Sequence, residues 1–193
     1  MTRLIPLLAA DRFASPWKNG GGTTSEVAVF PGGATMDDFQ WRVSIAEVTA
    51  PGAFSNFPQV DRVLAVIEGR LSLRIAEATE PVLLSPAIDA HGFPGDIAAF
   101  GEPLDGPVRD LNVMVRRGAW EATTRVLRPA GRVIVSDLTD TVIFVAMGET
   151  LLRHTSDSLR LGRLDAAFVE GASGQQVELV GEHPVYVIRL SSI

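Results

Sequence analysis

The sequence contains no cysteine and only three histidines, His91, His154 and His183, which lie far apart along the chain. The absence of cysteine excludes disulfide bonds, zinc knuckles, iron–sulfur ligation and thiol nucleophiles. No two histidines form an HxH or HxxxH pair, so neither a metal site nor a metal cofactor is expected. A chain without cysteine also fits a reducing compartment, and we expect a cytoplasmic protein.

Long hydrophobic runs and basic runs are lacking as well. No segment approaches the ~20 apolar residues of a membrane span. The apolar run Leu4–Leu8 is too short for a secretory signal, and we expect it to form the first β-strand. The 17 Lys and Arg are outnumbered by 23 Asp and Glu, and the arginines are dispersed. This distribution argues against nucleic-acid or membrane binding, so attraction for an anion must come from a local pocket.

Short segments rich in β-branched residues dominate the 193-residue chain, with Gly, Pro, Asp or Asn in the gaps between them. This pattern predicts an all-β sandwich or barrel. Helical periodicity is weak, and the two short candidates for a helix lie around Asp11 and at residues 118–123. The predicted strands are residues 4–8, 41–48, 62–67, 71–75, 111–115, 132–135, 142–147 and 185–190.

A weak internal repeat indicates two copies of one structural unit. DRVLAVIEGRLSLR begins at Asp61 and DTVIFVAMGETLLR begins at Asp140, and the two segments agree at six of fourteen positions. Each copy predicts a strand, a glycine turn and a second strand, in which Gly69 or Gly148 supplies a positive φ. We therefore expect two fused barrels, residues 1–125 and 126–193, with the second barrel completed by strand exchange with the first.

A glycine-rich segment, WKNGGGTT from Trp17, can bring backbone N–H groups close to an anion. It is neither a P-loop nor a dinucleotide fingerprint, because the GxxxxGK[ST] and GxGxxG patterns are absent. The segment predicts ligand contacts from Lys18, Asn19 and Gly21. The alternative is a glycine-rich turn that leads into a strand, with Trp17 filling the core.

Polar residues alternate along two of the predicted strands. An arginine on a cavity wall can hold a carboxylate through two hydrogen bonds, and an asparagine can both donate and accept. Arg42 and Asn112 are therefore candidates for binding an acid, and the alternative for Arg42 is an outward orientation beside an acidic partner. In the strand predicted at 41–48, one face carries Arg42, Ser44 and Ala46. In the strand predicted at 111–115 and its flanks, one face carries Asp110, Asn112, Met114 and Arg116.

Five segments, WKNGGGTT, WRVSIAEV, GAFSNFPQVDRVL, FPGD and DLNVMVRRG, occur in this order within residues 1–125. Together they resemble the HutD/Ves family, whose fold is similar to that of bicupins, a pair of jelly-roll β-barrels. The resemblance implies a role in histidine utilisation. The expected function is that of a sensor or governor that binds a small organic anion such as formylglutamate or urocanate.

The resemblance also implies a metal-free site. Ordinary cupins carry two histidines and then a glutamate, with six residues between the glutamate and a glycine. Counted back from Gly69, the glutamate position is occupied by Arg62, and the preceding stretch offers Asn56 and Pro58 rather than histidines. A guanidinium repels a metal ion and attracts a carboxylate, so Arg62 is expected at the centre of the site.

The alternative for Arg62 is a surface ion pair with Asp61 or Glu68. The second copy of the repeat has Thr141 at the corresponding position. The ligand pocket is therefore expected in the first barrel, and the second barrel is expected to be structural or to form a homodimer.

No catalytic motif emerges, since Ser55 lies in no GxSxG elbow, and the sequence favours binding over turnover. The alternative is a metal-independent isomerase or hydrolase acting on a small carboxylated substrate. Such an enzyme needs a general base, for which Glu26, Glu47 and His91 are the candidates. The predicted ligand-binding residues are Arg62, Arg42, Ser55, Asn112, Lys18, Asn19, Gly21 and Glu47.

Overall fold

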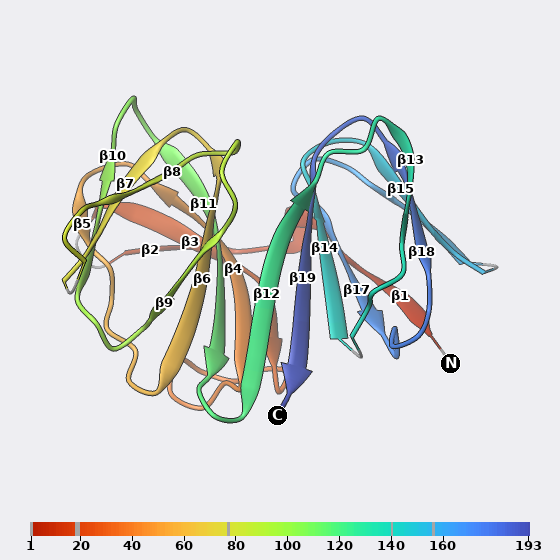
Figure 1. Cartoon of the computed structure of the whole chain (residues 1–193), viewed down its shortest axis with the longest axis horizontal. Coiled ribbons are helices and arrows are strands. Elements are labelled where there is room, and N and C mark those ends of the chain that lie inside the picture. Colours follow the sequence, from red (N-terminus) through yellow and green to blue (C-terminus); the bar gives the residue numbers. More distant parts are fainter. Residues whose placement is uncertain (1, 18–19, 77, 140, 156) are drawn as a thin grey trace. The chain divides into compact units, whose positions relative to one another are not determined.

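The computed structural model describes residues 2–17, 20–76, 78–139, 141–155 and 157–193. The chain divides into a first unit, Phe13–Glu121, and a second unit, Met1–Arg12 with Ala122–Ile193 (Figure 1). These bounds differ from the expected division after residue 125 chiefly at the N-terminus. The reason is that β1 (Arg3–Leu7) pairs with β17 (Ala166–Glu170), a strand of the second unit.

The first unit consists of two sheets whose neighbouring strands are antiparallel. The larger sheet has the order β2-β3-β4-β11-β6-β9, and the smaller has the order β5-β10-β7-β8. The larger sheet contains β2 (Ala14–Pro16), β3 (Gly22–Phe30), β4 (Trp41–Val48), β6 (Val60–Glu68), β9 (His91–Pro94) and β11 (Val108–Arg116). The smaller sheet contains β5 (Gly52–Ala53), β7 (Leu71–Ile75), β8 (Val82–Leu84) and β10 (Ala99–Pro103).

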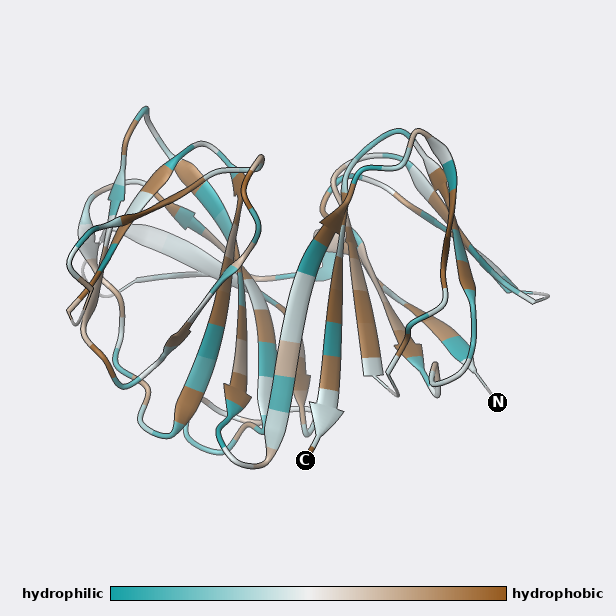
Figure 2. Cartoon of the chain, in the orientation of Figure 1, coloured by the Kyte–Doolittle hydropathy of each residue, from teal (hydrophilic) through white to brown (hydrophobic). Residues whose placement is uncertain are grey.

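Inward-facing apolar side chains hold the two sheets of the first unit together. Leu64 and Val66 of β6 pack in one cluster with Leu71 and Leu73 of β7, and each is at most 1% exposed. Figure 2 shows a hydrophilic band near the start of β6 and a hydrophobic stretch after it; successive side chains along the strand point to opposite faces of the sheet. Arg62 shares the inward face of β6 with Leu64 and Val66, so this arginine is directed between the sheets.

The second unit has the same two-sheet arrangement, with the orders β1-β17-β14-β19-β12 and β13-β18-β15-β16. Phe144, Leu152, Leu179 and Val187 belong to its core cluster and are fully buried. Its remaining elements are η1 (Ala9–Asp11), β12 (Trp120–Leu127), β13 (Gly131–Val135), β14 (Thr141–Ala146), β15 (Thr150–His154), β16 (Asp157–Leu161), β18 (Val177–Gly181) and β19 (Val185–Ser192).

Most of the predicted strands are confirmed, and residues 41–48 and 71–75 coincide with β4 and β7. The helix predicted at 118–123 is wrong, because Trp120 begins β12, which pairs with β19. Gly69 has the expected positive φ of 80°, whereas Gly148 does not. At Gly148 the ring of His183 occupies the place that a Cβ atom would take, so close packing explains this glycine.

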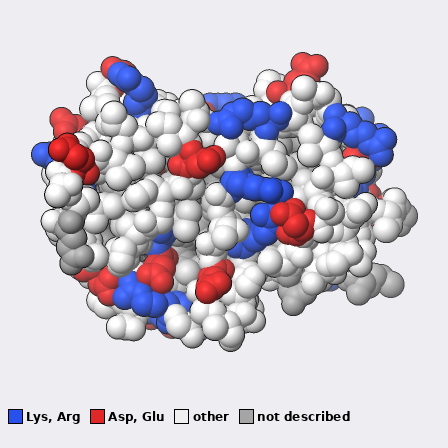
Figure 3. All heavy atoms as spheres, in the orientation of Figure 1, with Lys and Arg blue, Asp and Glu red and all other residues white. Residues whose placement is uncertain are grey.

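Acidic and basic side chains are interspersed on the face shown in Figure 3. Ion pairs tie neighbouring strands together; for example, Arg109 contacts Glu47 at 2.9 Å and Glu68 at 2.8 Å. In the described part of the chain, no helix is long and apolar enough to cross a membrane. Nor do the described residues contain a group of three His, Asp or Glu placed to hold a metal ion.

Candidate ligand-binding site

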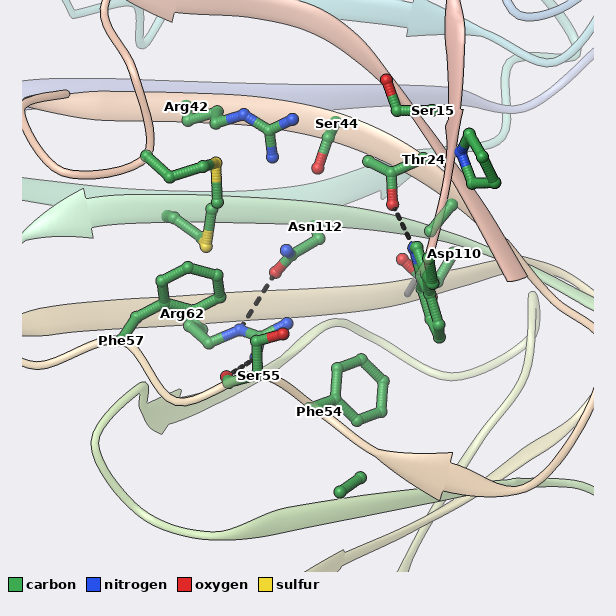
Figure 4. Close-up of a pocket in the computed structure, with 16 residues that line it drawn as sticks. Ser15, Thr24, Arg42, Ser44, Phe54, Ser55, Phe57, Arg62, Asp110 and Asn112 are labelled. Carbon is green, nitrogen blue, oxygen red and sulfur yellow. Dashed lines mark hydrogen bonds between the residues drawn. The ribbon is translucent and has the colours of Figure 1, made fainter. Parts of the chain in front are cut away.

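The first unit contains a partly open cavity of about 540 Å³ (Figure 4), a size typical of small-molecule sites. One wall is the inner face of β3, β4, β11 and β6, and the segment after β5 forms another. Apolar groups border the cavity, since Trp17 and Phe54 pack against one core cluster and Met114 and Phe57 lie in another. The lining residues are Ser15, Pro16, Trp17, Thr24, Met36, Arg42, Ser44, Ala46, Ala53, Phe54, Ser55, Phe57, Arg62, Asp110, Asn112 and Met114.

Strand register brings the polar lining residues together from segments far apart in sequence. Asn112 of β11 lies opposite Ser44 of β4, and Met114 lies opposite Arg42 of β4 on one side and Arg62 of β6 on the other. Alternation directs all five side chains to the same face of the sheet. The shared faces predicted from the sequence for Arg42 with Ser44 and for Asn112 with Met114 are therefore present.

Arg62 is the most enclosed cation of the cavity, with 3% of its surface exposed. Its Nε donates to Asn112 Oδ1 at 3.4 Å, and its Nη1 donates to the Ser55 carbonyl oxygen at 3.5 Å. Both distances are long for hydrogen bonds from a charged donor. The rings around the guanidinium are those of Phe54, Phe57 and Phe93, with centroids 4.9, 5.7 and 5.1 Å from Cζ.

The surface ion pair considered for Arg62 does not form. Asp61 pairs instead with Arg117 at 2.8 Å, and Glu68 pairs with Arg109. Burial lowers the pKa of Arg62 to about 10, and the charge of Asp110 opposes this shift. Arg62 therefore remains charged at neutral pH, and among the described residues no carboxylate lies within ion-pair distance of it.

Asp110 of β11 is the one carboxylic acid among the described residues that line the cavity. It is 1% exposed, and both of its carboxylate oxygens are buried without a hydrogen-bond partner. Burial raises the pKa of Asp110 to about 7, and the charge of Arg62 opposes the shift. A buried polar group without a partner is costly, so the bonding of this wall is incomplete.

Arg42 provides a second cation, with 12% of its side chain exposed. Its Nε donates to Glu26 Oε2 at 2.9 Å, so the acidic partner considered from the sequence exists although Arg42 lines the cavity. Nearby, Trp17 Nε1 donates to Thr24 Oγ1 at 2.7 Å. That bond fixes the indole ring at the edge of the cavity.

The structure brings four of the predicted ligand-binding residues together around the cavity, namely Arg62, Arg42, Ser55 and Asn112. Ser55 contributes at least its backbone carbonyl, which faces the Arg62 guanidinium (Figure 4). These four residues come from three strands and one loop, which explains why no local motif joins them.

The other predicted residues do not line the cavity or fall outside the described residues. Glu47 lies on the opposite face of β4 and pairs with Arg109 at 2.9 Å. The Gly21 carbonyl oxygen accepts from the Thr49 backbone N–H at 3.0 Å, which gives this glycine a structural role at the start of β3. Lys18 and Asn19 are not among the described residues.

Sequence reasoning did not select Asp110, Thr24, Phe54 or Phe57 as site residues, although all four line the cavity. Asp110 carried a usable signal, because alternation placed it on the same face as Asn112. The aromatic residues carried none, since an apolar ring in a β-rich chain usually marks the core.

None of the three bases considered for an enzyme lines the cavity. Glu26 is held by Arg42 and Glu47 by Arg109. His91 lies in β9, where its ring stacks near that of Phe93 with centroids 6.4 Å apart. Asp110 therefore replaces them as the titratable acid of this site.

The paired antiparallel sheets of each unit have a cupin-like, jelly-roll fold. A variant of oxalate decarboxylase from Bacillus subtilis superposes with a TM-score of 0.63 at 8% identity, covering 96% of this chain and 76% of that one. At this identity the similarity concerns the fold alone. It confirms the predicted all-β class of two jelly-roll units, with open rather than closed sheets.

The family of this chain is shown by proteins whose sequences are more similar to it than that of oxalate decarboxylase. The HutD family model matches residues 9–187, and the chain belongs to this family. An uncharacterised 21.2 kDa protein in the hutC 3' region of Pseudomonas putida is 30% identical over 172 residues, 89% of each chain. HutD from Pseudomonas fluorescens SBW25 is 26% identical with a TM-score of 0.82, covering 99% of this chain and 100% of that one. Protein Ves of Citrobacter koseri is 37% identical over 112 residues, which are 57% of this chain and 56% of that protein.

Proposed function

We propose that this protein binds a small organic acid in the cavity of its first unit and releases it unchanged. The observation that carries the proposal is Arg62, a buried cation that faces the cavity with two long hydrogen bonds and no ion pair among the described residues. A ligand carboxylate would complete its bonding with two short, charge-assisted hydrogen bonds. Arg42, on the other side of β11, would attract a second carboxylate.

Membership in the HutD family supports a role in histidine utilisation, as a sensor or governor of that pathway. The similarity to a protein in the hutC 3' region of Pseudomonas putida supports the same assignment. Formylglutamate and urocanate are the proposed ligands, because each carries a carboxylate and is small enough for a cavity of about 540 Å³.

Isothermal titration of N-formyl-L-glutamate and of urocanate into the wild type and the Arg62→Met variant tests this proposal. Methionine is long, unbranched and apolar, so it suits the aromatic surroundings of Arg62. A charge-assisted hydrogen bond contributes about 1.5–3 kcal/mol, and we expect affinity to fall at least ~10-fold. Arg70→Met is the matched control, because Arg70 is exposed and pairs with Asp105 away from the cavity.

Equal affinities of the wild type and Arg62→Met for both acids would remove Arg62 from the site. Failure of both acids to bind the wild type, in a screen where other carboxylates bind, would overturn the ligand assignment but not the site.

A second candidate function is catalysis without a metal, and Asp110 is the observation that favours it. A general base operates best with a pKa near the working pH, and burial raises the pKa of Asp110 to about 7. Proton NMR of formylglutamate or urocanate incubated with the protein tests this function. Turnover by the wild type that disappears in Asp110→Asn would favour an enzyme, whereas unchanged ligand spectra favour binding alone.

A further inference from the structure

Asp110 places a buried acid in the wall of a cavity whose proposed ligand is itself an acid. The two carboxylate oxygens of Asp110 are excluded from solvent and accept no hydrogen bond. The residues opposite it on the neighbouring strands are apolar, namely Ala46 of β4 and Val66 of β6. An ionised Asp110 therefore depends for its stabilisation on charges elsewhere in the cavity.

Two arginines supply those charges. Among the described residues that line the cavity, the charged ones are Asp110 of β11, Arg62 of β6 and Arg42 of β4. Arg42 is paired with Glu26 at 2.9 Å. Arg62 remains as the cation that supports an ionised Asp110, and its charge opposes the effect of burial on the pKa of that carboxyl. The other polar side chains of the lining are neutral, and they are Ser15, Thr24, Ser44, Ser55 and Asn112.

We propose that a bound carboxylate takes over from Asp110 as the counter-charge of Arg62, and that Asp110 takes up a proton when the ligand binds. This inference rests on the proposed function for the anion site and adds the regulation of that site by pH. The bound anion neutralises the attraction that kept Asp110 ionised, and it adds a like charge nearby. Protonation of Asp110 removes both costs. A proton reaches a buried carboxyl through brief local opening, so the coupling requires no contact between the ligand and Asp110.

The direction of the pH dependence follows from this coupling. Burial raises the pKa of Asp110 to about 7 without ligand, and the bound anion raises this pKa further. Below about pH 7 the carboxyl is protonated in both the free and the bound protein, so affinity does not change with pH. Above that value binding must take up a proton, so affinity falls as pH rises. We expect the dissociation constant to rise at least ~5-fold between pH 6 and pH 8.

Isothermal titration of N-formyl-L-glutamate at pH 6, 7 and 8 measures this change. Carboxylic acids in water titrate well below this range, so the probe remains fully ionised and a proton taken up on binding is bound by the protein. Repeating the titration at pH 7.5 in buffers of different ionisation enthalpy counts the protons, and we expect about 0.5–1 proton per ligand.

The Asp110→Asn variant removes the titrating group and keeps the size of the side chain. We expect it to bind the probe equally at pH 6 and pH 8, to take up no proton, and to bind more tightly than the wild type at pH 8. Histidine side chains also titrate in this range. His91→Asn, which removes the histidine of the first unit, is therefore the matched control and should keep the pH dependence of the wild type. Thermal unfolding checks that both variants are folded.

The outcomes separate this inference from the proposed function. Loss of both the pH dependence and the proton uptake in Asp110→Asn supports the coupling. An unchanged wild-type affinity from pH 6 to pH 8, or a pH dependence that Asp110→Asn retains, overturns the coupling and leaves the anion site standing. Failure of the wild type to bind the probe at all three pH values overturns the proposed formylglutamate site together with the inference that rests on it.

Discussion

The raised pKa of Asp110 predicts a pH dependence of stability that the Asp110→Asn variant should lack. Burial raises this pKa from 3.8 to about 7 in the folded chain. Between these two values the folded state retains a proton that the unfolded state has lost, so the free energy of unfolding falls as pH rises. Above about pH 7 both states are ionised, and the contribution of Asp110 becomes constant.

The magnitude follows from the size of the shift. Each pKa unit corresponds to about 1.4 kcal/mol, so a shift of about three units destabilises the fold by about 4 kcal/mol above pH 7. More than half of this destabilisation develops between pH 5 and pH 8. For a chain of this size, that difference corresponds to roughly 5–10 °C in the midpoint of thermal unfolding.

The assay compares urea and thermal unfolding of the wild type and Asp110→Asn from pH 5 to pH 8 without ligand. Titrating groups common to both proteins cancel in the difference, which leaves the contribution of residue 110. The variant should gain stability relative to the wild type by roughly 2–3 kcal/mol over this range. Parallel pH profiles would refute the reasoning, because they would show that the folded carboxyl ionises as it does in the unfolded chain.

Two further substitutions test the packing around the site and the second core. In Gly101→Ala the new Cβ would lie 2.6 Å from Cε2 of Phe54, so that ring must move. Calorimetry and titration should show about 1–3 kcal/mol less stability and weaker formylglutamate binding, whereas Gly32→Ala, which meets nothing within 4 Å, should change neither. Phe144→Ala removes a fully buried ring from the second core, and urea unfolding should show a loss of about 3–5 kcal/mol; a loss below 1 kcal/mol would contradict this packing.

The local pattern of the sequence was enough to predict strands that form the first unit. The strands at 41–48 and 71–75 were predicted within their observed bounds, because period-two alternation and β-branched residues depend on the strand alone. The same alternation placed Arg42 with Ser44 and Asn112 with Met114. The family resemblance placed Arg62 by its distance from Gly69, whose turn has the expected positive φ.

Other features depended on partners distant in sequence. The segment from Trp120 is a strand because it pairs with β19, and no local signal records that pairing. Glu47 lies on the face of β4 opposite to that of Arg42. Its ion-pair partner there, Arg109, is contributed by β11. The N-terminal strand is held by β17, more than 150 residues later.

The sequence by itself determined an all-β chain without thiol or histidine-rich metal chemistry, with an arginine at the position where a cupin keeps its carboxylate ligand. The first of these conclusions needs only residue types and spacing along the chain, whereas the position of the arginine also needs the family resemblance. The tertiary structure alone decided that Arg62 is surrounded by three aromatic rings. It also decided that the Asp110 carboxylate is buried without a hydrogen-bond partner. Burial and the absence of a hydrogen-bond partner are properties of everything that surrounds a side chain, and strands from across the first unit supply those surroundings.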